Sequence, residues 1–259
     1  MEHESNLLPN SATSLAKGLE ILRCFSAREP ALSNSQLASY TGLPKSTVSR
    51  LTKTLVELGY LRHDQKRRQY RIGPSVLALG YAALSNLRVI DIARPHMQAL
   101  AEATDALISL AIRDRLSMLY IEACSSDANL TLKMGRGVHM PMITTSIGRA
   151  FLASLPKLER EYLITQIQSE QPQQVQADIL AALNAELDFF NRNKYCRSFG
   201  EWKKDVNAVS APIQWPDGTD LVVLSISGPS FIITPRLLED ELVPRLLSLT
   251  DYISSQLVL

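Results

Sequence analysis

LSNSQLASYTGLPKSTVSRLTKTLVELG, residues 32–59, is the stretch of sequence that decides the fold. It predicts one helix from about Asn34 to Thr41 and a second from about Pro44 to Leu58, ended by Gly59. Gly42 falls between them, where a turn needs positive φ and a small residue lets two helices cross closely. The apolar residues of the second helix recur at helical spacing, as Val48, Leu51, Leu55 and Leu58. The pattern predicts a helix-turn-helix.

The outward face of the second helix is short, basic and hydroxylated once the apolar positions are assigned inward. It carries Lys45, Ser46, Thr47, Ser49, Arg50 and Lys53. Such side chains contact phosphates and base edges of double-stranded DNA. The face therefore predicts a recognition helix, with a plain helical hairpin and a solvated polar face as the alternative.

A short basic hairpin is expected directly after this helix. Tyr60–Arg62 and Gln69–Ile72 have the pattern of two strands, and the loop between them carries Lys66, Arg67 and Arg68. A hairpin with three consecutive cations at its tip, placed after a recognition helix, is typical of a wing that reaches the minor groove or its phosphates. A solvated basic loop is the alternative.

Composition places the chain among globular proteins, with 259 residues, 46% hydrophobic and 20% charged. No apolar stretch approaches the roughly 20 residues that span a bilayer, and acids near Met1 do not resemble a signal peptide. Three separated cysteines indicate neither a disulfide framework nor a zinc site. We therefore expect a cytoplasmic protein with no membrane partner, no metal and no cofactor.

The net charge of +1 hides an asymmetry that favours a DNA-binding first third. Residues 1–87 hold 11 Lys and Arg against 6 Asp and Glu, whereas residues 88–259 hold 16 against 20. Basic charge confined to one segment is typical of a DNA-binding module attached to a neutral or acidic regulatory domain.

Four segments are expected along the chain. Residues 1–13 form a mobile tail, and residues 14–73 form the winged helix-turn-helix domain. Its first helix has Ser14 as N-cap and an apolar stripe made of Leu15, Leu19, Leu22 and Phe25. Residues 74–87 form a linker helix that is apolar on more than one side, so it packs against a second copy of the chain or docks within its own.

The last segment, residues 88–259, reads as an α+β domain with a mostly antiparallel sheet. Its expected helices cover 88–104, 146–154, 157–169, 175–193 and 234–257. Its expected strands cover 106–113, 116–124, 129–134, 195–199, 206–214 and 220–227, with a turn at 216–218.

A candidate anion site lies where the loop 135–145 meets the next helix. Thr145 and Ser146 stand at the helix start, where free N–H groups and the helix dipole favour a carboxylate. Ser225 and Ser227 lie two apart in a strand and so point to one face. Met140, Ile147 and Val206 are expected to supply apolar walls. The alternative is that the serines are satisfied by the sheet.

Two further readings stay open near this site. Glu201 and Trp202 either close over the pocket or cap a surface loop. Cys124 or Cys196 could make the protein a redox-responsive regulator instead of a ligand-responsive one. Catalysis is not expected, because no nucleophile elbow, zinc-binding helix or phosphate loop appears in the sequence.

Six stretches together resemble the IclR family of bacterial transcription regulators over about residues 14–257. They are SLAKGLEIL (14–22), GLPKSTVSRL (42–51), YRIG (70–73), GRAFLA (148–153) seven residues after Pro141, API (211–213) and SISGP (225–229). Two departures stand out: Asp205 and Lys194 lie where the family often has glycine.

The resemblance implies a winged helix-turn-helix, a linker helix and a GAF-like effector domain in a homodimer that can assemble into tetramers. It implies control of catabolic operons by small organic acids, as repressor or activator. The effector contacts that it implies are Met140, Ser146, Ile147, Ser198, Ala208, Ser225 and Ser227.

Overall fold

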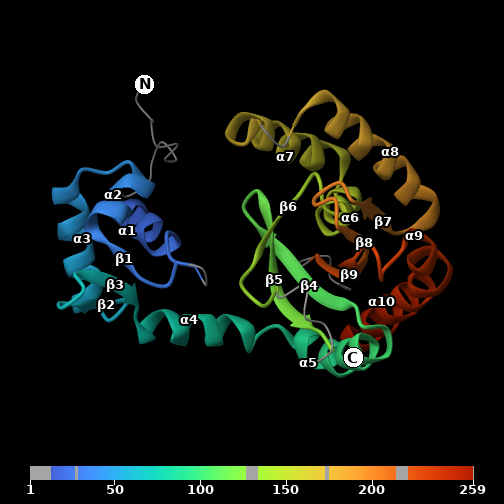
Figure 1. Ribbon diagram of the computed structural model, residues 1–259, viewed down its shortest axis with the longest axis horizontal. Coiled ribbons are helices and arrows are strands. Elements are labelled where there is room, and N and C mark those ends of the chain that lie inside the picture. The colour runs from blue at the N-terminus through green and yellow to red at the C-terminus, as the bar shows by residue number, and fades with distance from the viewer. Residues whose placement is uncertain (1–12, 27–28, 127–133, 173–174, 214–220, 259) are drawn as a thin grey trace. The chain divides into compact units, whose positions relative to one another are not determined.

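The computed structural model describes residues 13–26, 29–126, 134–172, 175–213 and 221–258. The chain divides into two compact units, up to Asn86 and from Leu87 onward (Figure 1). Each has its own hydrophobic core, and each is described separately below. The expected tail lies outside the described residues except for Thr13, which begins the first helix.

Unit 1 is a helix-turn-helix followed by a strand hairpin. Its elements are α1 (Thr13–Arg23), β1 (Leu32–Ser33), α2 (Asn34–Thr41), α3 (Lys45–Glu57), β2 (Leu61–Asp64), β3 (Gln69–Ile72) and α4 (Pro74–Leu84). Ser33 and Gln36 form a capping box at the start of α2. Gly42 ends α2 with φ of 67°, so the turn has the left-handed conformation that its glycine was expected to supply.

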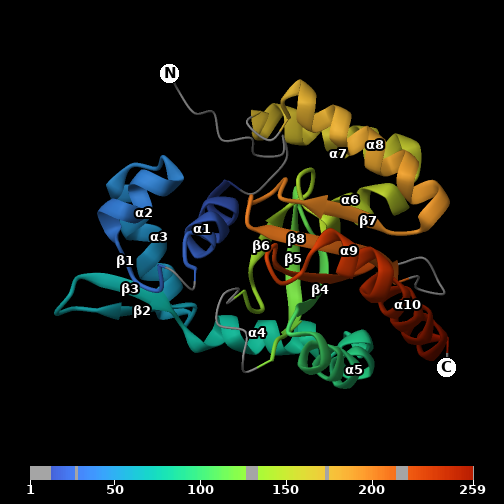
Figure 2. The same ribbon diagram turned by 45° about the vertical axis from the view of Figure 1, so that its right-hand side comes forward.

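The hairpin β2–β3 is completed by a third short strand that sequence reasoning missed. The described strands run in the order β1-β3-β2, with Leu32 opposite Tyr70. Asp64 Oδ1 accepts hydrogen bonds from the backbone N–H of Lys66 and of Arg67, which closes the tip. Figure 2 shows the hairpin projecting away from α2 and α3. Unit 1 is therefore a winged helix-turn-helix.

The buried face of α1 differs from the expected one. Leu15 and Leu19 are 65% and 51% exposed, while Ile21 is fully buried against Leu37 and Val48. The expected stripe holds only at its end, where Leu22 and Phe25 are partly buried. The expected inward position of Leu58 is also wrong, since it is 60% exposed. The packing partners α2 and α3, rather than the density of leucines, decide which face of α1 is buried.

Helix α4 has no buried residue in the described structure. Three of its large apolar side chains are more than half exposed: Leu77, Leu79 and Tyr81. The described residues of unit 1 do not bury them. A helix of this composition is unfavourable in water unless something else covers it.

Unit 2 is a three-layer α+β domain. Its helices are α5 (Arg88–Thr104), α6 (Ser146–Ser154), α7 (Lys157–Glu170), α8 (Ala177–Asn193), α9 (Pro235–Leu237), the π-helix η2 (Leu238–Leu242) and α10 (Val243–Leu257). Its strands are β4 (Leu107–Asp114), β5 (Ser117–Cys124), β6 (His139–Pro141), β7 (Cys196–Phe199), β8 (Val206–Ile213) and β9 (Val222–Pro229).

The described strands of unit 2 form one antiparallel sheet in the order β6-β5-β4-β9-β8-β7. Helices α5 and α10 pack on one face and α6, α7 and α8 on the other (Figure 1). Buried residues on both faces explain why β9 is buried along its whole length. The second face, under α6, is the one that bears on function.

A β-bulge in β5 reassigns its side chains between the two faces. Leu110 pairs with Glu122 and Ala111 pairs with Tyr120, so Ile121 is an extra residue. Tyr120 consequently packs on the α6 side, whereas Ile121 belongs to the α5 side. Glu122, with Leu110 opposite, binds Arg94 of α5 and Arg136.

Several expectations for unit 2 need correction. The single closing helix is broken, because Pro244 has no N–H to donate back along the chain, and the N–H of Val243 bonds to Leu238 five residues earlier instead. Strand β6 was not expected. Apart from Met134, which is in no strand, the strand predicted at 129–134 lies outside the described residues, as does the turn at 216–218.

Lys194 explains one departure from the family pattern. It ends α8 in the left-handed region, with φ of 66° and ψ of 14°. This conformation costs a residue with a Cβ more than it costs glycine. The glycine that the family often has at this position therefore avoids a steric cost of the backbone. In this chain Lys194 adopts the same fold with local backbone strain.

Candidate functional site

The expected recognition residues lie on α3 and are accessible. Five of them are exposed and Thr47 is half-buried; the exposed five are Lys45, Ser46, Ser49, Arg50 and Lys53. Lys53 Nζ lies 4.0 Å from Glu57 Oε1, and an ion pair this exposed contributes little to stability. Lys66, Arg67 and Arg68 are exposed at the tip of the wing. Unit 1 therefore holds one set of exposed cations on helix α3 and the other at the tip of the β2–β3 hairpin.

Unit 2 contains a narrow cavity beneath α6. All nine residues expected to contact a ligand line it: Met140, Thr145, Ser146, Ile147, Ser198, Val206, Ala208, Ser225 and Ser227. Sequence reasoning missed Tyr120 and Met134, and left Trp202 undecided. The bulge in β5 is what turns Tyr120 toward the cavity, and no sequence pattern indicated that bulge.

The start of α6 presents backbone donors at the cavity. Thr145 is the N-cap, and its Oγ1 accepts a hydrogen bond from Gly148 N at 3.2 Å. The next amide, Arg149 N, bonds to Thr145 O. Since the first N–H groups of a helix have no partner inside it, the amides of Ser146 and Ile147 are left free of helical bonds. Together with the helix dipole they favour an anion.

Gly148 is required by close packing at this helix start. A Cβ at this position would lie 2.3 Å from the backbone oxygen of Met142, which is too close for any side chain. The segment before α6 can therefore fold back tightly against it. Ser198 Oγ donates to Thr144 O at 2.8 Å and holds the same segment to β7.

The serine hydroxyls of the cavity differ in how well they are satisfied. Ser146 Oγ lies 2.7 Å from Ser210 Oγ, and Ser225 Oγ donates to Val209 O at 3.3 Å. Ser227 Oγ is buried and has no hydrogen-bond partner among the described residues. The expectation that Ser225 and Ser227 share a face is confirmed by their register with Ser210 and Ala208. For Ser225 the sheet itself supplies the partner; for Ser227 it does not.

The two buried cysteines of unit 2 are poorly suited to redox sensing. Burial strongly raises the pKa of Cys196, with Glu186 adding to the rise, and burial also raises the pKa of Cys124. A thiol is reactive as its thiolate, which a raised pKa depletes.

The described residues contain neither a metal-ligand cluster nor a single membrane-spanning helix. No group of three or more His, Cys, Asp or Glu side chains is placed to hold a metal ion. No single helix is long and apolar enough to cross a membrane; α4 and α5 reach that length only when taken together across a break.

The fold and the site now define a class. A winged helix-turn-helix, with basic residues along its second helix and wing, is joined in one chain to a domain that holds a lined cavity. This is the construction of a DNA-binding transcription regulator.

Comparison with known proteins gives the family. Residues 14–65 match the IclR helix-turn-helix domain, and residues 81–255 match the C-terminal domain of the bacterial transcriptional regulator IclR. The chain belongs to the IclR family of bacterial transcription regulators. It is 37% identical over 248 residues to the HTH-type transcriptional regulator TsaQ1/TsaQ2 of Comamonas testosteroni, covering 94% of this chain and 88% of that one.

Solved structures agree with this assignment. An IclR family transcriptional regulator from Brucella abortus superimposes with a TM-score of 0.84 at 41% identity, covering 95% of this chain and 93% of that one. An IclR homolog from Microbacterium hydrocarbonoxydans, complexed with 4-hydroxybenzoate, has the same fold at a TM-score of 0.75 and 22% identity, covering 94% and 98%. The Comamonas and Brucella relatives are named as transcription regulators, a class of protein that is not enzymatic.

Proposed function

We propose that the chain binds operator DNA under the control of a small carboxylate, aliphatic or aromatic, held in the cavity of unit 2. The observation that carries this is the buried hydroxyl of Ser227, which lines the cavity without a partner among the described residues. A buried hydroxyl is costly when unpaired. A carboxylate between it and the free amides of Ser146 and Ile147 would satisfy all three donors.

The walls of the cavity support a small ligand with an apolar or aromatic body. Met140, Ile147 and Val206 are buried apolar residues, and Tyr120 and Trp202 add aromatic rings. Apolar walls with a few placed donors are typical of small-molecule sites. The 4-hydroxybenzoate bound to the Microbacterium homolog belongs to the proposed class, as a carboxylate on one ring.

The DNA contacts are assigned to the two exposed basic sets of unit 1. Helix α3 is proposed to enter the major groove, with Arg50 near base edges or adjacent phosphates. Lys66, Arg67 and Arg68 at the wing tip are proposed to contact phosphates or the minor groove. The regulated genes are proposed to form a catabolic operon.

A homodimer is proposed to form through α4, with a dimer of dimers as a further assembly. Leu77, Leu79 and Tyr81 are 59%, 58% and 65% exposed on this helix. A second copy would cover them with the same apolar surface, as an isologous interface requires. Two linked subunits would also engage two half-sites of an operator and gain effective concentration.

A thermal-shift screen of the full chain tests the carboxylate. Each acid is paired with its neutral amide, for example 4-hydroxybenzoate with 4-hydroxybenzamide. A ligand that binds only the native state raises Tm by mass action. We expect at least one acid to raise Tm while its amide does not, and to change binding to a duplex selected from a random-sequence pool. Equal shifts by acids and amides would contradict an anion site.

The redox alternative predicts a different result. A regulator that senses through Cys124 or Cys196 would change its operator affinity on oxidation, with no need for a small molecule. Because burial raises the pKa of both thiols, we expect operator affinity to be the same in reducing and mildly oxidising buffer.

A further inference from the structure

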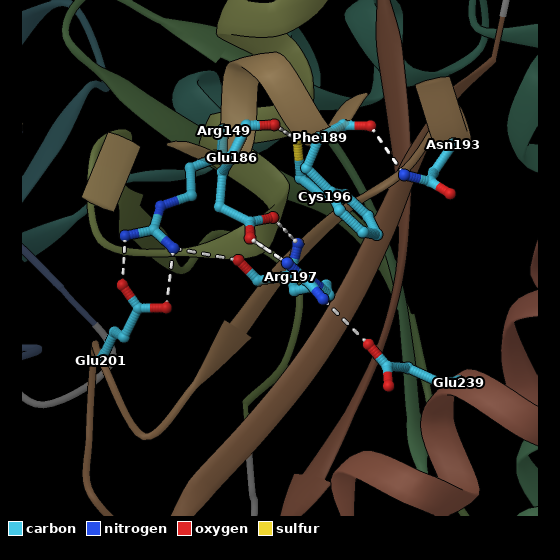
Figure 3. Close-up of polar contacts among 8 residues, drawn as sticks. All are labelled: Arg149, Glu186, Phe189, Asn193, Cys196, Arg197, Glu201 and Glu239. Carbon is cyan, nitrogen blue, oxygen red and sulfur yellow. Dashed lines mark hydrogen bonds and ion pairs between the residues drawn. The ribbon is translucent and has the colours of Figure 1, made fainter. Parts of the chain in front are cut away.

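One buried cation, the guanidinium of Arg149, lies beside the cavity but is not among the residues that line it. The side chain of Arg149 on α6 is 1% exposed. Its Nε donates to Ile143 O at 2.8 Å, and its Nη1 donates to Arg197 O at 3.0 Å and to Glu201 Oε1 at 2.9 Å. Nη2 binds the second carboxylate oxygen of Glu201. Figure 3 shows this two-pronged pair reaching from α6 to the segment after β7.

The charge of Arg149 depends on Glu201. The neighbouring Arg197 has carboxylates of its own, since its guanidinium binds Glu186 and Glu239 (Figure 3). Among the described ion pairs, Glu201 is the carboxylate that faces Arg149. If the Glu201 segment moved away, a guanidinium would be left buried without its counter-charge, which is strongly unfavourable. The pair therefore favours the position in which Glu201 is held against α6.

Holding Glu201 also holds Trp202, the next residue and part of the cavity wall. Most of the lining is buried, but Met134, Trp202 and Ala208 keep partial exposure and so mark the open side of the cavity. Two bonds close the turn itself, from Gly200 N to Val206 O and from Val206 N to Lys203 O. The other described ties of segment 200–205 to the domain are the bond from Ser230 N to Asp205 O at 2.8 Å and the packing of Trp202 against the hydrophobic cluster under α6. Among the described ion pairs, the one between Arg149 and Glu201 is what ties this segment to α6.

We infer that Arg149 and Glu201 are positioning residues that hold Trp202 as the outer wall of the cavity, and so decide which effectors fit and how readily they leave. This inference rests on the proposed function for its purpose, because a wall matters only if the cavity is occupied. The anchoring itself is independent of any ligand. It is a property of the charge on Glu201, and not merely of the shape of its side chain.

Amide hydrogen exchange of the full chain, without ligand or DNA, tests the anchoring. Glu201→Gln keeps the size of a partly exposed side chain and removes its charge. Segment 200–206 should exchange about tenfold faster, the ratio that corresponds to about 1.4 kcal/mol in the opening equilibrium. Glu170→Gln, a neutralisation at an exposed position of α7, is the matched control and should leave this segment unchanged.

Fluorescence of Trp202 gives a second readout. Trp215→Phe leaves Trp202 as the only tryptophan, and acrylamide is the small probe that reaches its ring. In this background Glu201→Gln should raise the quenching rate constant and Glu170→Gln should not. Arg149→Lys, which keeps the charge but cannot form the two-pronged pair, should shift both readouts in the same direction as Glu201→Gln.

Two results would overturn the inference. One is unchanged exchange and quenching in Glu201→Gln. The other is faster exchange across the whole of unit 2, because the pair would then support the domain in general and not the position of Trp202. A failed carboxylate screen combined with the expected exchange result would refute the ligand while leaving the anchor in place.

Discussion

Ser227→Ala should stabilise the empty protein and at the same time weaken its response to ligand. The hydroxyl of Ser227 is buried without a partner among the described residues, and an unpaired buried group costs about 1–3 kcal/mol. Removing it should therefore recover about 1 kcal/mol. For a domain of this size that gain corresponds to a rise in Tm of roughly 2–4 °C. Most serine-to-alanine changes at buried, satisfied positions have the opposite sign.

The same substitution should reduce the shift that a bound carboxylate produces. A ligand at 100 times its Kd stabilises by about 2.7 kcal/mol. Losing a hydrogen bond to a charged group costs about 1.5–3 kcal/mol of affinity, so Kd rises by at least about tenfold. At the same ligand concentration the stabilisation then falls to about 1.4 kcal/mol or less.

Scanning fluorimetry of three proteins, with and without the best acid from the screen, measures both effects. Ser225→Ala is the matched control: its hydroxyl already donates to Val209 O, so its removal should lower the Tm of the empty protein by a small amount. A Ser227→Ala protein that melts below the wild type without ligand would refute the reasoning about the unpaired hydroxyl. A ligand-induced rise in Tm as large as that of the wild type would show that the carboxylate does not bind to Ser227.

Four other outcomes are expected. Arg50→Ala should weaken specific DNA binding by about 1–3 kcal/mol if it contacts a base, whereas Arg67→Ala should lower the slope of log K against log salt by roughly one; binding isotherms at several salt concentrations separate the two. Leu79→Asp should convert the proposed dimer to monomer in sedimentation at micromolar concentration without lowering Tm by cavity formation, because Leu79 is not buried within unit 1. Burial raises the pKa of Glu122, but Arg136, the Ala123 amide and Arg94 outweigh burial and lower this pKa overall. The ionised carboxylate therefore stabilises the fold above the unfolded pKa of about 4.3, and this stabilisation is lost as the pH falls through the folded pKa. In denaturant melts Glu122→Gln should be less stable than the wild type at pH 7 and should approach the stability of the wild type below about pH 4. Lys194→Gly should raise Tm by roughly 2–4 °C by removing about 1 kcal/mol of left-handed strain. A lower Tm would mean that the lysine side chain itself stabilises the domain.

Local rules predicted the elements of unit 1 well and their faces less well. The glycine at position 42 acts over a few residues, so the turn between α2 and α3 could be inferred directly. The capping box of Ser33 and Gln36 is equally local but was not part of the prediction. The buried side of α1 depends on where α2 and α3 lie. Leu15 and Leu19 have the right spacing for a core and lie outside it in this chain.

The cavity was predictable where strand alternation and helix ends determine it. Ser225, Ser227 and the start of α6 follow from periods of two and from an N-terminal helix signal. Tyr120 and Trp202 did not follow, because one depends on a bulge and the other on an ion pair to a distant helix. Such features arise from tertiary structure and leave no periodic trace in the sequence.

Because of the extra residue in β5, two side chains that are only two positions apart, Tyr120 and Glu122, face different regions of the domain. Tyr120 lies at the cavity, and Glu122 binds Arg94 of α5, the helix that begins at Arg88 just after the linker. In a regular strand these side chains would share a face, and the carboxylate would lie among the ligand-facing groups. A bulge also bends its strand and increases the local twist. Tyr120 at the cavity and the ion pair between Glu122 and α5 are therefore separated by a single residue of β5, Ile121, although they lie on opposite faces of the sheet.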